Sequence, residues 1–140
     1  MFAKTGSAAE ICDQMGGLVA LAESNFLEDV TTANSIGMLP GAEKCSVVRS
    51  LSGANTYHCA WGFDYRSDAA KQSFEAVNQM VRDCFGDSSE SVKDAGVNHP
   101  DTYYQRQHIL DEIVISVSLK DKVALQQTYV FVGIHGAPKG

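Results

Sequence analysis

The strongest constraint on the fold of this chain is the regular alternation of apolar and polar residues between positions 112 and 119. Successive side chains of a β-strand point to opposite faces, so the alternation predicts a strand with one buried face. The buried set is Ile113, Ile115, Val117 and Leu119. Segments 102–110 and 126–135 flank this strand, which predicts three antiparallel strands covered by the rest of the chain on one side.

An earlier hairpin is predicted from Glu43 to Leu51 and from Asn55 to Phe63, with its turn at 52–54. The odd positions of both strands carry the apolar side chains, as the period of two in a strand requires. The expected core positions are Cys45, Val47, Leu51, Tyr57, Cys59, Trp61 and Phe63. Arg49 is the one exception on that face.

Two helices are predicted by apolar residues at intervals of three and four. The first covers 8–23 and contains a glycine pair at 16–17, which indicates a kink or the close approach of a neighbouring backbone. The second helix begins at a cap on Asp64 or Ser67 and continues to Phe85. It has the clearest helical periodicity in the sequence.

The expected fold is α+β, with the order α-β-β-α-β-β-β, an antiparallel sheet of about five strands and two helices packed on one face. The polar stretch 86–101 is expected to be a loop that includes a short strand at 91–93. We expect a single domain over 1–140, because a second core would be too small.

Three further segments are expected to be irregular. The ends at 1–7 and 136–140 are predicted to be flexible tails. Segment 25–42 is rich in turn-forming residues, but loops of this length are uncommon in compact domains. Part of it is therefore expected to be helical or to contribute to function.

Four cysteines permit three disulfide pairings, and the predicted topology favours one of them. Cys45 and Cys59 share one face of the hairpin on either side of its turn, so their β-carbons can reach disulfide distance. If the helices lie antiparallel, Cys12 at the start of the first meets Cys84 at the end of the second. That second bridge closes a loop of about 70 residues and should stabilise more than the hairpin bridge, by roughly 4 kcal/mol.

Two other uses of the cysteines stay open. Free cysteine packs as a small hydrophobe, so four buried thiols in a cytosolic protein are one alternative. Zinc is the other, although no pair has the C-x₂₋₄-C spacing of structural zinc sites and no C-x-x-C redox motif is present. The even count and compatible geometry favour disulfides and an oxidising compartment, periplasmic or extracellular, over a metal site.

The charge pattern argues against nucleic-acid partners. The net charge is −6, and the 11 basic residues are scattered without forming a basic stripe. The longest apolar run, Leu18 to Ala22, is far shorter than the ~20 residues that span a bilayer. The first residues lack the pattern of a signal peptide, so an exported protein would have lost its signal; the cytoplasm is the alternative location.

The sequence contains no recognisable catalytic motif. Gly-x-Ser-x-Gly, the phosphate-binding loop and the dinucleotide-binding glycine pattern are all absent, and we expect no cofactor. A small enzyme remains an alternative, in which His99 beside Asp101, or His108, acts as acid or base.

The candidate binding surface lies on the strand at 102–110. Tyr103 and Tyr104 point to opposite faces, so one of them lies outside the core. We expect Tyr104, Arg106 and His108 to share the outer sheet face, with His99 in the preceding turn. An ordinary polar outer face is the alternative.

These features favour an exported, disulfide-stabilised, noncatalytic binding, inhibitor or accessory module for a protein or small-molecule ligand. Besides the small enzyme, the alternative is a cytosolic ligand-binding α+β domain that forms a homodimer through its sheet, with segment 25–42 closing a cavity. Linked cysteines favour the exported module, whereas free thiols favour the cytosolic domain.

Overall fold

A computed structural model describes residues 8–26, 38–49, 51, 53–86, 88–94 and 103–136. Its helices are α1 (Ala8–Glu23), α3 (Asp68–Cys84) and the short 3₁₀ helix η1 (Val123–Leu125). Its strands are β1 (Lys44–Val48), β2 (Thr56–Asp64), β3 (Ser89–Asp94), β4 (Tyr103–Leu110), β5 (Ile113–Lys122) and β6 (Gln127–His135). The fold is α+β, as the sequence predicts.

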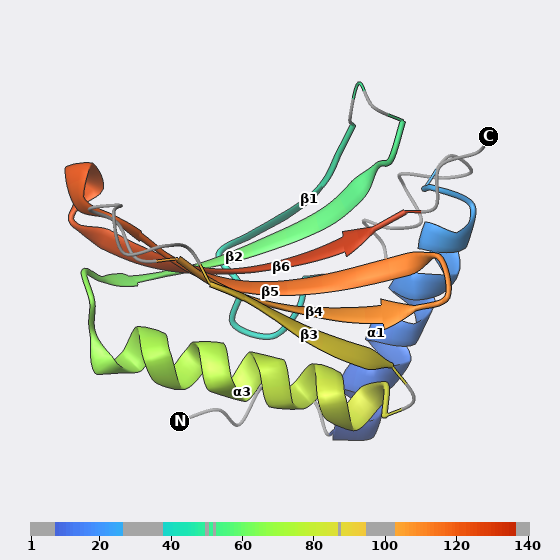
Figure 1. Cartoon of the computed structure of the whole chain (residues 1–140), viewed down its shortest axis with the longest axis horizontal. Coiled ribbons are helices and arrows are strands. Elements are labelled where there is room, and N and C mark those ends of the chain that lie inside the picture. Colours follow the sequence, from blue (N-terminus) through green and yellow to red (C-terminus); the bar gives the residue numbers. More distant parts are fainter. Residues whose placement is uncertain are drawn as a thin grey trace.

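The strands form one antiparallel sheet in the order β1-β2-β6-β5-β4-β3 (Figure 1). The sheet has six strands, close to the expected number of about five. The additional strand is β3, of which the sequence indicated only the short stretch 91–93. Its pairing with β4, which places Val92 opposite Arg106, extends it to Ser89–Asp94.

The β1–β2 hairpin has the predicted register, because Cys45 lies opposite Cys59. These residues form a disulfide with a Cα–Cα distance of 4.1 Å. The first strand is shorter than predicted and ends at Val48. Leu51 was therefore wrongly assigned to the core: it lies beyond the strand and is fully exposed.

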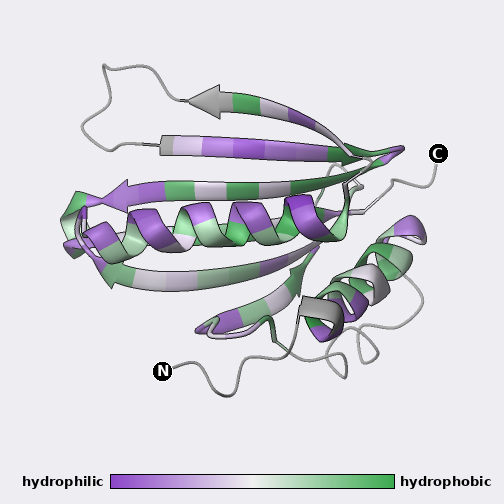
Figure 2. Cartoon of the chain, turned by 90° about the horizontal axis from the view of Figure 1, so that it is seen from below, coloured by the Kyte–Doolittle hydropathy of each residue, from purple (hydrophilic) through white to green (hydrophobic). Residues whose placement is uncertain are grey.

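Helix α3 begins at the predicted cap on Ser67, whose hydroxyl accepts a hydrogen bond from the backbone N–H of Ala70 at 3.2 Å. The alternative cap, Asp64, is the last residue of β2. Figure 2 shows α3 along the middle of the sheet, with β3 and β4 on one side and β1 and β2 on the other. Its apolar face is buried at Ala70, Phe74, Val77 and Val81.

Helix α1 begins beside the end of α3, where Cys12 and Cys84 form the second predicted disulfide with a Cα–Cα distance of 5.1 Å. The sequence-based argument assumed that the two helices lie antiparallel, but in the structure they do not. Instead α1 runs away from α3 at an angle and closes one end of the core with Met15, Leu18 and Ala22 (Figures 1 and 2). The contact between the two helix ends is enough to bring the cysteines together.

Two asparagines fasten the end of α1 to the hairpin. Asn25 Oδ1 accepts from the backbone N–H of Asn55 at 2.7 Å, and Asn55 Nδ2 donates to the carbonyl of Asn25 at 3.0 Å. The backbone N–H of Gly136 donates to the carbonyl of Asn55 at 2.7 Å. The expected flexible tails at 1–7 and 136–140 remain untested, because all of their residues except Gly136 lie outside the described residues.

The predicted close approach to Gly16 is not present among the described residues: a Cβ added there would meet no atom within 4 Å. We therefore expect Gly16→Ala to raise the free energy of unfolding by about 1 kcal/mol, since alanine reduces the backbone entropy of the unfolded chain. Urea denaturation measures this change. Ala20→Gly, at an exposed position of the same helix, is the matched control and should lower stability by a similar amount; a destabilising Gly16→Ala would contradict the expectation.

The sheet face opposite the helices, here called the outer face, is covered in its centre by its own side chains. Ser116 and Ser118 are both buried, although the sequence suggested a face left open to solvent. Gln105 donates to the hydroxyl of Ser118 at 3.4 Å, and Nε2 of His135 lies 3.0 Å from the hydroxyl oxygen of Ser116. Larger neighbours thus close over small residues without a second layer of helices in the described part of the chain.

Candidate functional site

Two hollows flank α3, one on the β2 side and one on the β4 side. We call the first the Trp61 pocket. Its apolar lining includes Pro40, Trp61, Phe63, Ala69, Ala76 and Val77, and its polar side chains are Glu43, Gln72 and Ser73. The volume is about 550 Å³, within the range of roughly 300–1,000 Å³ that is typical of small-molecule sites.

The indole of Trp61 is fixed in one orientation. Its Nε1 donates to the carbonyl of Pro40 at 3.1 Å. Gly41, with a φ of 77°, allows the chain to turn closely over this ring, because its added Cβ would lie 3.4 Å from the indole nitrogen. The ring is therefore a preformed wall of the pocket and not a flexible flap.

One ionisable side chain, Glu43, is found among the residues that line the Trp61 pocket. Its Oε2 accepts a hydrogen bond from the backbone N–H of Gly62 at 3.0 Å, which holds the carboxylate at the wall. A negative charge in an apolar hollow repels anionic ligands. The pocket is thus suited to neutral or cationic molecules.

On the other flank of α3 lies a polar hollow, here called the Tyr104 cleft. It consists of two adjoining depressions of about 240 and 330 Å³ that share Lys71, Tyr104 and Leu119. Its cationic side chains are Arg66, Lys71 and Arg106, and its carboxylates are Glu75 and Asp121. Leu119, Ala70 and Phe74 supply the apolar part of its lining.

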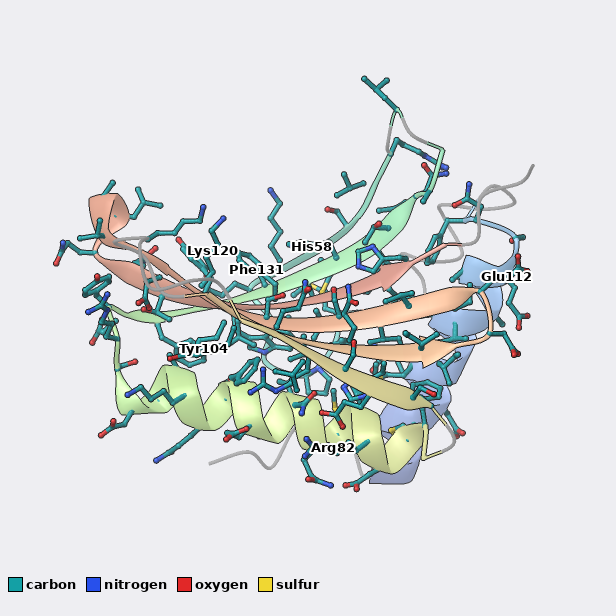
Figure 3. All side chains as sticks on the ribbon, in the orientation of Figure 1. His58, Arg82, Tyr104, Glu112, Lys120 and Phe131 are labelled. Carbon is teal, nitrogen blue, oxygen red and sulfur yellow. A yellow bond between two sulfur atoms is a disulfide. The ribbon has the colours of Figure 1, made fainter. Side chains whose placement is uncertain are left out.

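The candidate residues of β4 lie on the opposite face from the one expected. Tyr104, Arg106 and His108 do share a face, but that face is directed toward α3. Figure 3 shows Tyr104 on the helix side of the sheet, whereas His58, Phe131 and Lys120 lie on the outer face. The reason is that polar residues of α3 pack against this end of the sheet. Tyr104 and Arg106 line the cleft, whereas His108 lies further along the helix.

His108 is completely buried and bonds to α3 instead of facing solvent. Its Nε2 lies 2.7 Å from Oδ1 of Asn78, whose Nδ2 donates to Glu90 at 3.4 Å. Arg82 forms an ion pair with Glu90 at 2.7 Å. Because the amide oxygen of Asn78 must accept, Nε2 carries the proton, and the buried Nδ1 has no hydrogen-bond partner among the described residues.

Burial lowers the pKa values of His58, His108 and His135 below their usual 6.5. The unfolded chain therefore binds more protons than the folded chain once the pH falls through about 6.5. The hydrogen bond and ion pair with Arg82 also hold the pKa of Glu90 at about 2, which adds a second loss of stability below its usual 4.5. Both shifts make acid destabilising.

We accordingly expect the free energy of unfolding to fall between about pH 7.5 and pH 5.5. His108→Gln, which keeps a side-chain donor for Asn78 but does not titrate, should reduce that dependence. Urea denaturation at the two pH values measures it in both proteins. Equal slopes would show that His108 does not stay neutral in the folded protein.

The remaining histidines do not assemble a site in the described residues. His99 and Asp101 lie outside them, so the predicted turn is untested. His58 contacts Phe131 on the outer face, with ring centroids 5.0 Å apart, and His135 bonds to Thr56 at 3.1 Å. No group of three potential metal ligands occurs in this part of the chain.

The sequence matches no protein-family model, and no curated protein shows significant similarity to it. No described helix is both long and apolar enough to pass through a bilayer.

Sequence reasoning missed the Trp61 pocket because it assigned Trp61 and Phe63 to the closed core. A signal was present in α3: Ala69, Ser73 and Ala76 are small residues spaced by four and three, and so share one flank of the helix. Small side chains beside a tryptophan leave volume unfilled. That pattern could have indicated a hollow between the helix and β2.

Proposed function

We propose that this chain is an exported, noncatalytic binding module that holds a small, mainly apolar ligand in the Trp61 pocket. The observation that carries the proposal is a preformed apolar hollow of about 550 Å³ with a fixed tryptophan in its wall. Such hollows, with a few oriented polar groups, are the usual form of small-molecule sites. Glu43 favours a neutral or cationic ligand over an anionic one.

Export is supported by the two disulfides, which join all four cysteines. Disulfides persist in oxidising compartments and are rare where thiols are kept reduced. The cytosolic ligand-binding dimer is the alternative, and it requires free thiols in the native protein. The ligand pocket itself is compatible with either location.

The enzymatic alternative has less support at His108. That side chain is completely buried, bonded to Asn78, and lines neither the Trp61 pocket nor the Tyr104 cleft. A general base must reach the proton it abstracts, directly or through one water. The binding function requires no such access.

Fluorescence titration tests the proposal, because Trp61 is the single tryptophan of the chain. The probe is N-phenyl-1-naphthylamine, an uncharged aromatic molecule. We expect saturable quenching of Trp61 emission in the wild-type protein. Ser73→Phe places a ring in the pocket and should raise the dissociation constant by about tenfold or more, which corresponds to about 1.4 kcal/mol.

Gln79→Phe is the matched control, since it adds the same ring at an exposed position of α3 outside the pocket. It should change the dissociation constant by less than about twofold. Urea denaturation of each variant verifies that the fold is retained. The absence of saturable quenching, or equal weakening by both substitutions, would refute the proposed site.

A further inference from the structure

We propose that the Tyr104 cleft is a second ligand site, distinct from the Trp61 pocket, and that it takes a small aromatic carboxylate. The two sites lie on opposite flanks of α3 and differ in charge. This inference goes beyond the proposed function and does not depend on it.

Cationic side chains from three separate elements converge on the cleft. Arg66 comes from the turn before α3, Lys71 from the helix, and Arg106 from β4. The net charge of the chain is −6, whereas the lining of this cleft is cationic on balance. The lining supplies the donors and the positive charge that a carboxylate requires.

The carboxylates of the cleft only partly offset these cations. Asp121 is 3% exposed, and its Oδ2 is paired with Nε of Arg66 at 2.8 Å. Its Oδ1 accepts from the hydroxyl of Thr128 at 2.7 Å. Over the residues that line the cleft, three cations stand against two carboxylates, Glu75 and Asp121, so the lining keeps a net positive charge.

Arg66 is held in place before any ligand arrives. Its backbone adopts a φ of 53°, a left-handed conformation that is costly for a residue with a side chain. Its N–H donates to Oγ1 of Thr128 at 2.7 Å, and its guanidinium lies over the ring of Tyr65 at 5.0 Å. A group ordered in advance loses little entropy when it binds.

The apolar part of the cleft accounts for the aromatic body of the ligand. Leu119 is 5% exposed, and the guanidinium carbon of Arg106 lies over the ring of Phe74, 5.5 Å from its centroid. Tyr104 stands beside them and is 38% exposed. A flat apolar molecule can lie against the ring of Tyr104, beside the nearly buried Leu119, while its carboxylate meets the cationic rim.

Calorimetric titration with 2-naphthoate and with its uncharged amide, 2-naphthamide, tests the site. We expect naphthoate to bind about tenfold or more tightly than the amide, with an affinity that decreases as salt is added. Amide resonances of residues 66, 67, 104 and 106, which line the Tyr104 cleft but not the Trp61 pocket, should shift during an NMR titration. Resonances of Trp61 should not.

Three variants locate the charge dependence. Lys71→Gln combined with Arg106→Gln should weaken naphthoate binding by about tenfold or more, whereas Lys44→Gln combined with Lys120→Gln removes the same charge from the outer face and should have little effect. Glu75→Gln should strengthen binding by about two- to fivefold. Arg66 is left intact because its loss would strand the buried carboxylate of Asp121.

Equal affinities for naphthoate and its amide, or no binding of naphthoate at millimolar concentration, would overturn the proposal. So would equal weakening by the two double variants, or shifts confined to the Trp61 pocket. Urea midpoints of the variants confirm that each remains folded. Failure of this site would leave the fluorescence result for the Trp61 pocket unaffected.

Discussion

Replacing both Cys12 and Cys84 by alanine is expected to lower the free energy of unfolding by about 4 kcal/mol. The bridge joins residues separated by 72 positions, so it restricts a large part of the unfolded chain. The same relation between loop length and chain entropy predicts about 3 kcal/mol for the Cys45–Cys59 bridge, whose cysteines are 14 positions apart. The long bridge also fixes the start of α1 to the end of α3.

Urea denaturation of the oxidised proteins measures this loss. The single variant Cys12→Ala is the control, since removing either cysteine breaks the same bond and should give a similar loss. Mass spectrometry after alkylation should find no modified cysteine before reduction and four afterwards. A loss below about 1 kcal/mol, or free thiols in the native protein, would contradict the covalent link and favour the cytosolic alternative.

Ile115→Ala is expected to lower the free energy of unfolding by about 2–5 kcal/mol. Ile115 lies in the middle of β5, has no exposed surface, and is flanked by Ile134 on β6 and His108 on β4. Truncation removes buried apolar surface and leaves a cavity beneath α1 and α3. Urea denaturation provides the measurement.

Val114→Ala is the matched control for that substitution. Val114 is the preceding residue of β5, lies on the outer face and is only partly buried. It should cost less than about 1.5 kcal/mol. Equal losses at the two positions would show that the sheet does not have one helix-covered face.

The alternation of β5 and the odd positions of the hairpin predicted the sheet correctly because they depend on local geometry. A strand places every second side chain on one face wherever it lies in the fold. Ile113 and Ile115 are therefore buried as expected, and Cys45 faces Cys59. These features follow from the two-residue period of a β-strand and do not depend on which helices pack against the sheet.

The orientation of β4 was not predictable from its own residues. Tyr104, Arg106 and His108 are polar enough for an outer face, yet their face is directed toward α3, where Asn78 bonds to His108 and Phe74 packs against the guanidinium of Arg106. Only the tertiary arrangement decides which face of such a polar strand packs against a helix. The same limit applies to β3, whose sequence lacks apolar alternation and which forms through its pairing with β4.

The candidate sites show a related limit. Tyr104 and Arg106 were singled out as contact residues, and they do line a cleft, but on the helix side of the sheet. The Trp61 pocket was missed because a tryptophan in a strand resembles a core residue, and its 7% exposure is consistent with that assignment. The hollow arises from small residues on a helix that sequence alone does not place beside β2.

Helix α3 has a direct role in both proposed sites. Ser73 faces the Trp61 pocket, and Lys71, two residues earlier, faces the Tyr104 cleft. The bridge between Cys12 and Cys84 joins the far end of this helix to α1. Both proposed sites therefore require α3 to keep its position on the sheet. The Trp61 pocket is proposed for a neutral or cationic ligand, and the Tyr104 cleft for an anionic one.

The most direct test of the proposed function is an NMR titration of the ¹⁵N-labelled, oxidised protein with N-phenyl-1-naphthylamine. Saturable shifts are expected at 40–43, 61–63 and 69–77, the segments that line the Trp61 pocket. They should include the indole N–H of Trp61, which bonds to Pro40. Shifts concentrated on the outer face around His58 and Phe131, or no saturable shift, would contradict the assignment of this hollow as the ligand site.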